Sequence, residues 1–178
     1  MMKNIVLIGF MGTGKTAVGR RLAQRLRREF IDTDARIEEI TGKTITQIFA
    51  RDGVVRFRSE EALLVKKLAG REGLVISTGG GLVLDPENVR LLRQNGVLVA
   101  VTAAPEVIFD RVKSKRSRPL LLKGDLQELI QTLLKEREGV YDVAEFTVDT
   151  SSCGVDWAVE QIVHYLSERN LLNENCTG

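Results

Sequence analysis

The residues with the clearest chemical potential lie near the N-terminus of this 178-residue chain, in the run Gly9-Phe10-Met11-Gly12-Thr13-Gly14-Lys15-Thr16. The run fits the pattern G-x-x-x-x-G-K-[ST], which binds nucleotide phosphates where it follows a buried strand and opens a helix. Glycine lets the backbone curl until successive N–H groups point at phosphate oxygens, and the helix N-terminus adds a favourable dipole. We expect nucleotide contacts from Gly12, Thr13, Gly14, Lys15, Thr16 and Ala17. The alternative is a glycine-rich turn that fits the pattern by chance, and the apolar run before it and the helical pattern after it weigh against that.

Within this loop, Lys15 is predicted to reach the terminal phosphates, and the Thr16 hydroxyl is predicted to ligate Mg²⁺. The loop alone does not separate a kinase from a GTPase or a motor. The chain has no Asn-Lys-x-Asp sequence for guanine, and no apolar strand that ends in a metal-binding aspartate of the usual kind. The carboxylate that orients the metal must come from elsewhere, and Asp32 is the best candidate.

Two carboxylates, Asp32 and Asp34, follow the second predicted strand. Residues two apart in an extended segment point to the same side, and the carboxyl ends of parallel strands form the ligand crevice. We assign Asp32 to the Mg²⁺ shell and Asp34 to the acceptor hydroxyl, which it orients or deprotonates. The alternative makes Asp34 the N-cap of a helix from Ala35, a role that is compatible with substrate binding.

Two arginines have the chemistry to bind an acidic acceptor. Arg58 has Glu61 three residues ahead on a predicted helix, which indicates either an exposed ion pair of little consequence or an arginine held ready to grip a carboxylate. The sequence leaves these two readings even. Arg137 continues the apolar stripe of a predicted helix over 126–134 and leads on to Tyr141. A buried guanidinium needs a partner, which is either an acidic ligand or a structural salt bridge.

A basic loop without apolar periodicity spans about residues 113–124. By composition alone it is a solvated, mobile loop. In a kinase, such a loop has the further task of closing over the phosphates, excluding water and bringing a cation to the group in transit. We therefore predict a mobile lid over 113–124.

The pattern of the whole chain must position these residues. Short apolar runs alternate with amphipathic helical stretches, which predicts an α/β fold with a parallel sheet covered by helices. Strands are predicted at 5–8, 30–31, 74–76, 97–101 and 146–148, the last of them at a sheet edge. Asp85 and Pro86 predict a helix start. The chain shows no repeat or linker, so we expect one domain over 1–170 and a polar tail over 171–178.

Composition narrows the function classes. Hydrophobic residues make up 43% and charged residues 28%, as in ordinary globular domains, and the net charge is only +2 with 5% aromatics. This balance argues against a nucleic-acid partner. Cys153 and Cys176 show no metal-ligand spacing, which favours a reducing, cytoplasmic location. No apolar run reaches membrane-spanning length, so we expect no membrane partner, and we expect a monomer.

Taken together, these segments resemble the shikimate kinases. The matching motifs are, in order, Gly9–Thr16, Phe30–Asp34, Phe57-Arg58 with Glu61, Gly79–Gly81, Arg118-Pro119-Leu120-Leu121, and Arg137 with Tyr141. The likeness covers roughly residues 3–168, and the joint order and spacing are more specific than any single motif. It implies a three-layer, nucleoside-monophosphate-kinase-like P-loop kinase fold with a five-stranded parallel sheet and a mobile lid. It also implies transfer from ATP to the 3-hydroxyl of shikimate, in aromatic amino-acid biosynthesis.

The resemblance also implies roles for single residues. It assigns acceptor binding to Asp34, Arg58, Gly79, Gly80, Gly81 and Arg137. It assigns ATP contacts to Arg118 in the lid and to Arg111, which matches an adenine-facing arginine. Lys15, Asp34 and Arg118 are then the catalytic residues. One departure stands out: Val54 follows Gly53 where the family often has glutamate, so we expect a local change in packing or helix capping.

Two rival functions remain. A kinase of the same fold could act on another small acceptor, such as gluconate or a nucleoside monophosphate, but the two arginines and the glycine run weigh against this. A regulatory module that binds nucleotide without catalysis is the second rival. The joint presence of Lys15, Thr16, Asp32, Asp34 and Arg118 weighs against that.

Arg118→Ala is expected to lower turnover more than it weakens shikimate binding, because the predicted partner of Arg118 is the nucleotide phosphate. Steady-state kinetics with shikimate calorimetry measure the two effects separately. A collapse of shikimate affinity with normal turnover at saturation would show that the lid role is wrong.

Overall fold

The computed structural model describes residues 2–113 and 125–172, so most of the predicted lid, with Arg118, and the end of the predicted tail lie outside the described residues. The strands are β1 (Asn4–Ile8), β2 (Phe30–Asp32), β3 (Val75–Ser77), β4 (Gly96–Thr102) and β5 (Phe146–Asp149). They form one parallel sheet in the order β2-β3-β1-β4-β5. The predicted five-stranded parallel sheet, with the fifth strand at an edge, is confirmed.

Helices follow the strands as the sequence pattern predicts. They are α1 (Lys15–Leu26), α2 (Thr33–Thr41), α3 (Ile45–Arg51), α4 (Gly53–Ala69), α5 (Pro86–Gln94), α6 (Pro105–Lys113), α7 (Leu126–Glu136) and α8 (Gly154–Glu168), with short 3₁₀ turns η1 (Leu82–Leu84) and η3 (Val140–Val143). In α5, Pro86 takes the first position and the Asp85 carboxylate accepts from the Glu87 N–H, as predicted. No described helix is both long and apolar enough to cross a membrane.

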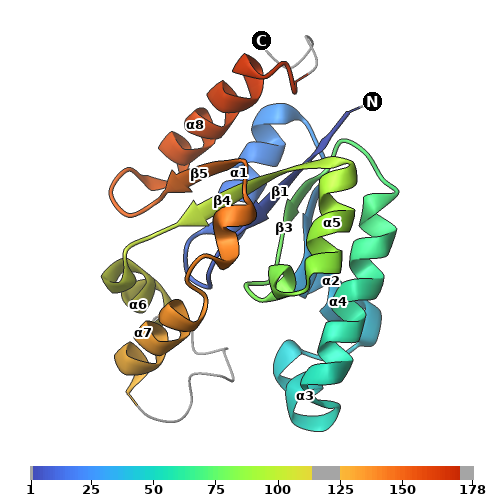
Figure 1. Ribbon diagram of the computed structural model, residues 1–178, viewed down its shortest axis with the longest axis vertical. Coiled ribbons are helices and arrows are strands. Elements are labelled where there is room, and N and C mark those ends of the chain that lie inside the picture. Colours follow the sequence, from blue (N-terminus) through green and yellow to red (C-terminus); the bar gives the residue numbers. More distant parts are fainter. Residues whose placement is uncertain (1, 114–124, 173–178) are drawn as a thin grey trace.

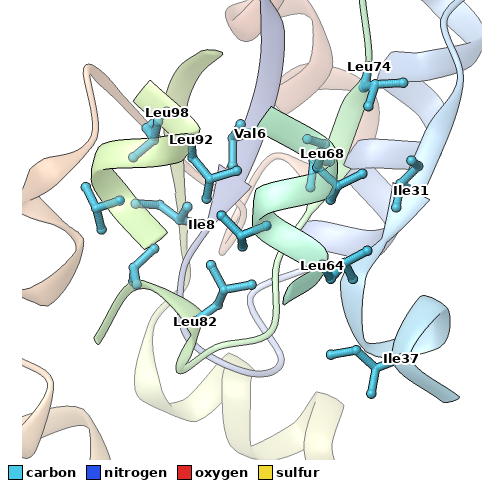
Figure 2. Close-up of a cluster of buried hydrophobic side chains, with 14 of the residues drawn as sticks. Val6, Ile8, Ile31, Ile37, Leu64, Leu68, Leu74, Leu82, Leu92 and Leu98 are labelled. Atoms are coloured by element: carbon cyan, nitrogen blue, oxygen red, sulfur yellow. The ribbon is translucent and has the colours of Figure 1, made fainter. Parts of the chain in front are cut away.

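The sheet is covered on both faces, which makes three layers (Figure 1). Successive residues of β1 point to opposite sides. Val6 and Ile8 join a cluster with Leu64 of α4 and Leu92 of α5, which Figure 2 shows. The side chains on the other face of β1 pack with α1 and α8 in a second cluster. Central strands buried on both sides explain why β1 and β4 read as unbroken apolar runs.

The structure corrects the prediction for Asp32 and Asp34. The segment is not extended, because α2 begins at Thr33 and its N-cap is Asp32, not Asp34. The Asp32 carboxylate accepts the N–H groups of Asp34 and Ala35 at 3.1 and 3.3 Å, which satisfies the first turn two residues earlier than predicted. Asp34 therefore lies inside the first turn, where its charge also favours the helix N-terminus.

The structure also corrects the path to Arg137. Helix α7 ends at Glu136, and Arg137 is its C-cap with a non-helical backbone. Gly139, in the left-handed region with φ +76°, then turns the chain into η3, which carries Tyr141. Arg137 and Tyr141 are therefore not on one continuous helical stripe, because a turn at Gly139 separates them.

Candidate active site

The phosphate loop joins β1 to α1 as predicted, and its backbone favours glycine by a close contact at Gly9 and by a left-handed conformation at Gly14. A Cβ at Gly9 would lie 2.2 Å from the carbonyl oxygen of Val101 in β4, and Gly14 has φ +100°. Lys15 is buried, and its ammonium donates to the carbonyls of Gly9 and Phe10 at 2.8 and 2.7 Å. Backbone carbonyls of the loop therefore hold the Lys15 side chain on the inside of the loop.

Thr16 and Asp32, which the sequence assigned to the metal shell, lie together. The Thr16 hydroxyl donates to Oδ2 of Asp32 at 2.8 Å, while Oδ1 of Asp32 caps α2. A hydroxyl beside a carboxylate at a phosphate loop fits the hard-oxygen preference of Mg²⁺, which takes few protein ligands and completes its shell with phosphate and water. The two residues present fit that ion.

A cavity of about 590 Å³ lies beside this loop. Its wall includes the predicted acceptor residues, namely Asp34, Arg58, Gly79, Gly80, Gly81 and Arg137, together with Asp32 of the predicted metal shell. The phosphate loop contributes Met11, and α3 contributes Ile45 and Phe49. The cavity therefore gathers the predicted acceptor residues, with their carboxylate and guanidinium groups, beside the loop that would hold a nucleotide.

The glycine run after β3 forms the cavity wall because charged side chains press against it. A Cβ at Gly79 would lie 2.5 Å from Oδ1 of Asp34, and one at Gly81 would lie 2.5 Å from Nη2 of Arg58. A Cβ at Gly80 would meet Nη1 of Arg137 at 3.3 Å. Each glycine thus faces one of the predicted acceptor side chains, and any Cβ at Gly79 or Gly81 would displace its charged neighbour.

The Arg58–Glu61 pair is more than an exposed ion pair. Nη1 of Arg58 donates to Oε2 of Glu61 at 2.5 Å, and the Glu61 side chain is fully buried whereas that of Arg58 is 37% exposed. Burial raises the pKa of the Glu61 carboxyl to about 7, a rise that Arg58 opposes and Asp34 augments. The pair fixes one edge of the Arg58 guanidinium on α4 and leaves part of it facing the cavity.

Arg137 is held from two sides. Its guanidinium lies 5.4 Å from the ring centre of Phe10 in the phosphate loop, and its Nη1 donates to the Gly80 carbonyl at 3.3 Å. The Tyr141 hydroxyl donates to the same carbonyl at 2.7 Å. Burial raises the pKa of Tyr141, and Arg137 opposes that rise. The glycine run, the phosphate loop and η3 therefore meet at Gly80.

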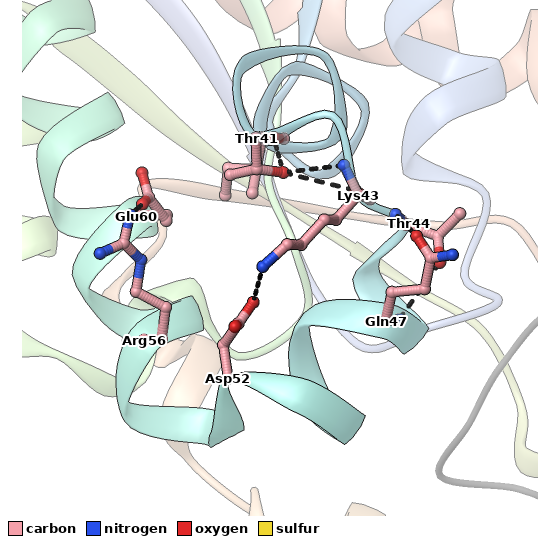
Figure 3. Close-up of polar contacts among 8 residues, drawn as sticks. Thr41, Lys43, Thr44, Gln47, Asp52, Arg56 and Glu60 are labelled. Atoms are coloured by element: carbon pink, nitrogen blue, oxygen red, sulfur yellow. Dashed lines mark hydrogen bonds and ion pairs between the residues drawn. The ribbon is translucent and has the colours of Figure 1, made fainter.

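Polar contacts hold the helices that carry the acceptor side chains (Figure 3). Lys43 donates to Oδ2 of Asp52 at 2.6 Å, and Thr44 and Gln47 form a capping box at the start of α3. Asp52 is the N-cap residue of α4, but its side chain makes no capping bond there. The first turn of α4 has no acidic residue, and Val54 in that turn is half exposed. The change in packing or capping expected from Val54 stays a prediction.

Arg111, predicted to face adenine, contacts the phosphate loop. Its guanidinium donates to the carbonyls of Gly12 and Thr13 at 3.3 and 3.2 Å, and to the hydroxyl and carbonyl of Thr150 at 2.9 and 2.8 Å. These bonds are made along the edge of the guanidinium. The role toward adenine stays a prediction.

Sequence reasoning missed two positioning side chains. The buried Thr33, between the two aspartates, accepts the Gly79 N–H at 2.9 Å and so ties α2 to the glycine run. Tyr141 was noted in a motif but given no role. A Thr flanked by two functional aspartates was the only signal for Thr33, and its partner is a backbone group that no pattern reveals.

A phosphate loop after the first strand, carboxylates after the second and an arginine-lined cavity between them define a P-loop kinase for a small acidic acceptor. The family model described as "Shikimate kinase" matches residues 11–167. The shikimate kinase of Pelotomaculum thermopropionicum is 74% identical over 171 residues, covering 96% of this chain and 99% of the relative. The chain belongs to the shikimate kinase family.

Solved structures agree with this assignment. A shikimate kinase from Acinetobacter baumannii, solved in complex with shikimate, has a TM-score of 0.90 at 37% identity and 96% coverage of both chains. A gluconokinase from Sinorhizobium meliloti has a TM-score of 0.61 at 21% identity, with 95% of both chains covered. The second likeness is one of fold alone. The predicted P-loop kinase fold is confirmed.

Gly81→Ala is expected to weaken acceptor binding about tenfold, because its Cβ would collide with the guanidinium of Arg58. The Michaelis constant for ATP should change little. Gly70→Ala is the matched control, since the nearest atom to a Cβ there lies 3.8 Å away at the end of α4. Equal kinetics for the two variants would contradict the contact.

Glu61→Gln is expected to alter the pH dependence of stability. The folded pKa of about 7 lies above the ordinary 4.5, so the folded protein keeps a proton that the unfolded chain releases between these values. The contribution of this carboxyl to stability is fully present below pH 4.5 and is lost as the pH rises through about 7.

The glutamine side chain does not titrate, so the free energy of unfolding of Glu61→Gln relative to wild type should rise across that window. Urea denaturation between about pH 5 and pH 8 measures this difference. A difference that stays constant with pH would contradict the burial argument.

Proposed function

We infer that this protein transfers the γ-phosphoryl group of ATP to the 3-hydroxyl of shikimate, giving shikimate 3-phosphate and ADP for aromatic amino-acid biosynthesis. The observation that carries the inference is the cavity in which Asp34, Arg58 and Arg137 converge on the glycine run beside the phosphate loop. Shikimate has a carboxylate and ring hydroxyls, which match two guanidinium groups, a carboxylate and backbone donors.

The two arginines are proposed to bind the shikimate carboxylate. A guanidinium offers two parallel N–H donors to a carboxylate, and a partner that fixes its orientation lowers the entropy lost on binding. Glu61 fixes Arg58 in this way, and the Phe10 ring with the Gly80 carbonyl fixes Arg137. Both groups are thereby oriented before the substrate enters.

Asp34 is proposed to hold the 3-hydroxyl in line with the γ-phosphorus and to accept its proton. Asp34 lies in the first turn of α2, and its carboxylate lies against the backbone of Gly79. Phosphoryl transfer depends on positioning and charge neutralisation more than on a strong base. Lys15 would neutralise charge on the transferring group, and Arg118 would do so from the lid.

We propose that Thr16 and Asp32 hold Mg²⁺ with the nucleotide, through the hydroxyl and carboxylate that lie 2.8 Å apart. When bound, Mg²⁺ neutralises phosphate charge and orients the nucleotide. Gly12, Thr13, Gly14, Ala17 and Arg111 complete the proposed ATP site.

The remaining proposals concern the whole chain. We propose one catalytic domain over 1–170 with a lid at about 113–124 and a tail over 171–178, acting as a cytoplasmic monomer without a nucleic-acid or membrane partner. Leu171 and Leu172, the first two residues of this tail, pack against the core cluster that contains Leu166 of α8.

A coupled ADP-release assay across shikimate, gluconate and the nucleoside monophosphates tests the function. Of these acceptors, only shikimate should cause ADP release in proportion to the amount added. Lys15→Ala should abolish this release while leaving the fold intact. Preference for gluconate or a nucleotide would assign another acceptor. ADP binding without transfer to any acceptor would favour a regulatory module.

Arg58→Lys and Arg137→Lys are expected to raise the Michaelis constant for shikimate roughly tenfold to a hundredfold, with that for ATP little changed. An ammonium keeps the charge but loses the planar fork, and a charge-assisted bond contributes about 1.5–3 kcal/mol. Melting temperatures measured alongside distinguish the alternative that both arginines are structural. A loss of stability that impairs both substrates alike would overturn the acceptor site.

A further inference from the structure

Thr150 follows β5 directly and lies buried behind the phosphate loop. It is 2% exposed, and its N–H donates to the Thr102 carbonyl at 2.9 Å, which extends the pairing of β4 with β5. Its hydroxyl lies 2.6 Å from the carbonyl oxygen of Thr13 and 2.9 Å from Nη1 of Arg111. A buried hydroxyl thus connects the sheet edge, α6 and the centre of the nucleotide loop.

The bonding of this hydroxyl can be assigned by counting. A threonine hydroxyl has one hydrogen to donate. Two carbonyls lie within reach, that of Thr13 at 2.6 Å and that of Thr102 at 3.1 Å. The Thr102 carbonyl already accepts the Thr150 N–H, and the Thr13 carbonyl is nearer. The hydroxyl therefore donates to Thr13 and accepts from Arg111.

The centre of the loop depends on these contacts from distant parts of the chain. At the start of the loop, the carbonyls of Gly9 and Phe10 are bound from within, by Lys15. The carbonyls of Gly12 and Thr13 are bound instead by side chains from α6 and from the end of β5. These external bonds hold the two central peptide groups in place.

The orientation of those carbonyls decides where the N–H donors point. A trans peptide is planar, with its C=O and N–H directed to opposite sides. The Gly12 carbonyl shares a peptide plane with the Thr13 N–H, and the Thr13 carbonyl shares one with the Gly14 N–H. Holding both oxygens toward Arg111 and Thr150 turns both N–H groups the other way, toward the inside of the loop, where a phosphate is bound.

We propose that Thr150 is a positioning residue of the nucleotide site: its hydroxyl anchors the Thr13 carbonyl, so that the Thr13–Gly14 peptide presents its N–H to a nucleotide phosphate. Arg111 is the second anchor of the same peptides. The inference rests on the proposed function insofar as it takes the phosphates of ATP to bind in this loop. If the competent loop conformation becomes a minority, apparent nucleotide affinity falls by that fraction.

Thr150→Val tests this directly, because valine keeps the branched shape and lacks the hydroxyl. We expect ADP, titrated by calorimetry, to bind about tenfold more weakly, which is about 1.4 kcal/mol. The dissociation constant for shikimate should stay within about twofold of wild type, because the acceptor cavity does not include Thr150. Thr150→Ser restores the hydroxyl and should recover most of the ADP affinity.

Thr147→Val is the matched control, since Thr147 lies exposed on β5, the strand that Thr150 follows; this variant should bind ADP like wild type. If Thr150→Val does not fold, Thr150→Ala removes the same hydroxyl in its place. ADP affinity within about twofold of wild type in the folded valine or alanine variant would overturn the proposal. So would an equal loss for ADP and shikimate that serine does not reverse, because that pattern indicates general destabilisation.

The proposed function is measured separately in the same preparations. A wild-type protein that binds ADP but does not phosphorylate shikimate would refute the acceptor and leave the Thr150 comparison valid. A wild-type protein that phosphorylates shikimate, with unaltered ADP binding in Thr150→Val, would refute only the role of Thr150.

Discussion

The backbone of Gly79–Gly81 lies so close to charged side chains that a Cβ atom at its first or last position would be 2.5 Å from one of them. This contact sets the shape of the acceptor cavity. Asp34 comes from α2, Arg58 from α4 and Arg137 from the end of α7, and each of the three side chains lies against one residue of the glycine run. The run also supplies polar groups. The Gly79 N–H donates to the Thr33 hydroxyl, and the Gly80 carbonyl accepts from the Tyr141 hydroxyl.

The strand order brings the phosphate loop, the glycine run and the two aspartates to one edge of the sheet. β3 lies between β1 and β2, so the glycine run after β3 emerges between the phosphate loop and the aspartates. Parallel strands present their carboxyl ends together, which places ligands at that edge. The phosphate loop and the aspartates therefore lie on either side of this backbone segment, and the bond between Thr16 and Asp32 joins the two flanking elements.

The sequence predicted a structural feature best where only one residue could fill a given role. The phosphate loop and the pairing of Thr16 with Asp32 followed from motif and strand order. The helix start at Thr33 did not, because either Asp32 or Asp34 can cap a helix and only the backbone geometry decides between them. Thr150 was invisible for a similar reason: its partners are a carbonyl and a guanidinium far away in the chain, and no spacing encodes that contact.

Two pre-oriented arginines are proposed to recognise the carboxylate of the acceptor. Calorimetric titration with shikimate and with its methyl ester tests it most directly, because the ester keeps the ring and hydroxyls but has no negative charge. If the claim holds, the ester binds at least about tenfold more weakly than shikimate, as expected when a charge-assisted bond is lost. Equal affinities for acid and ester would contradict it.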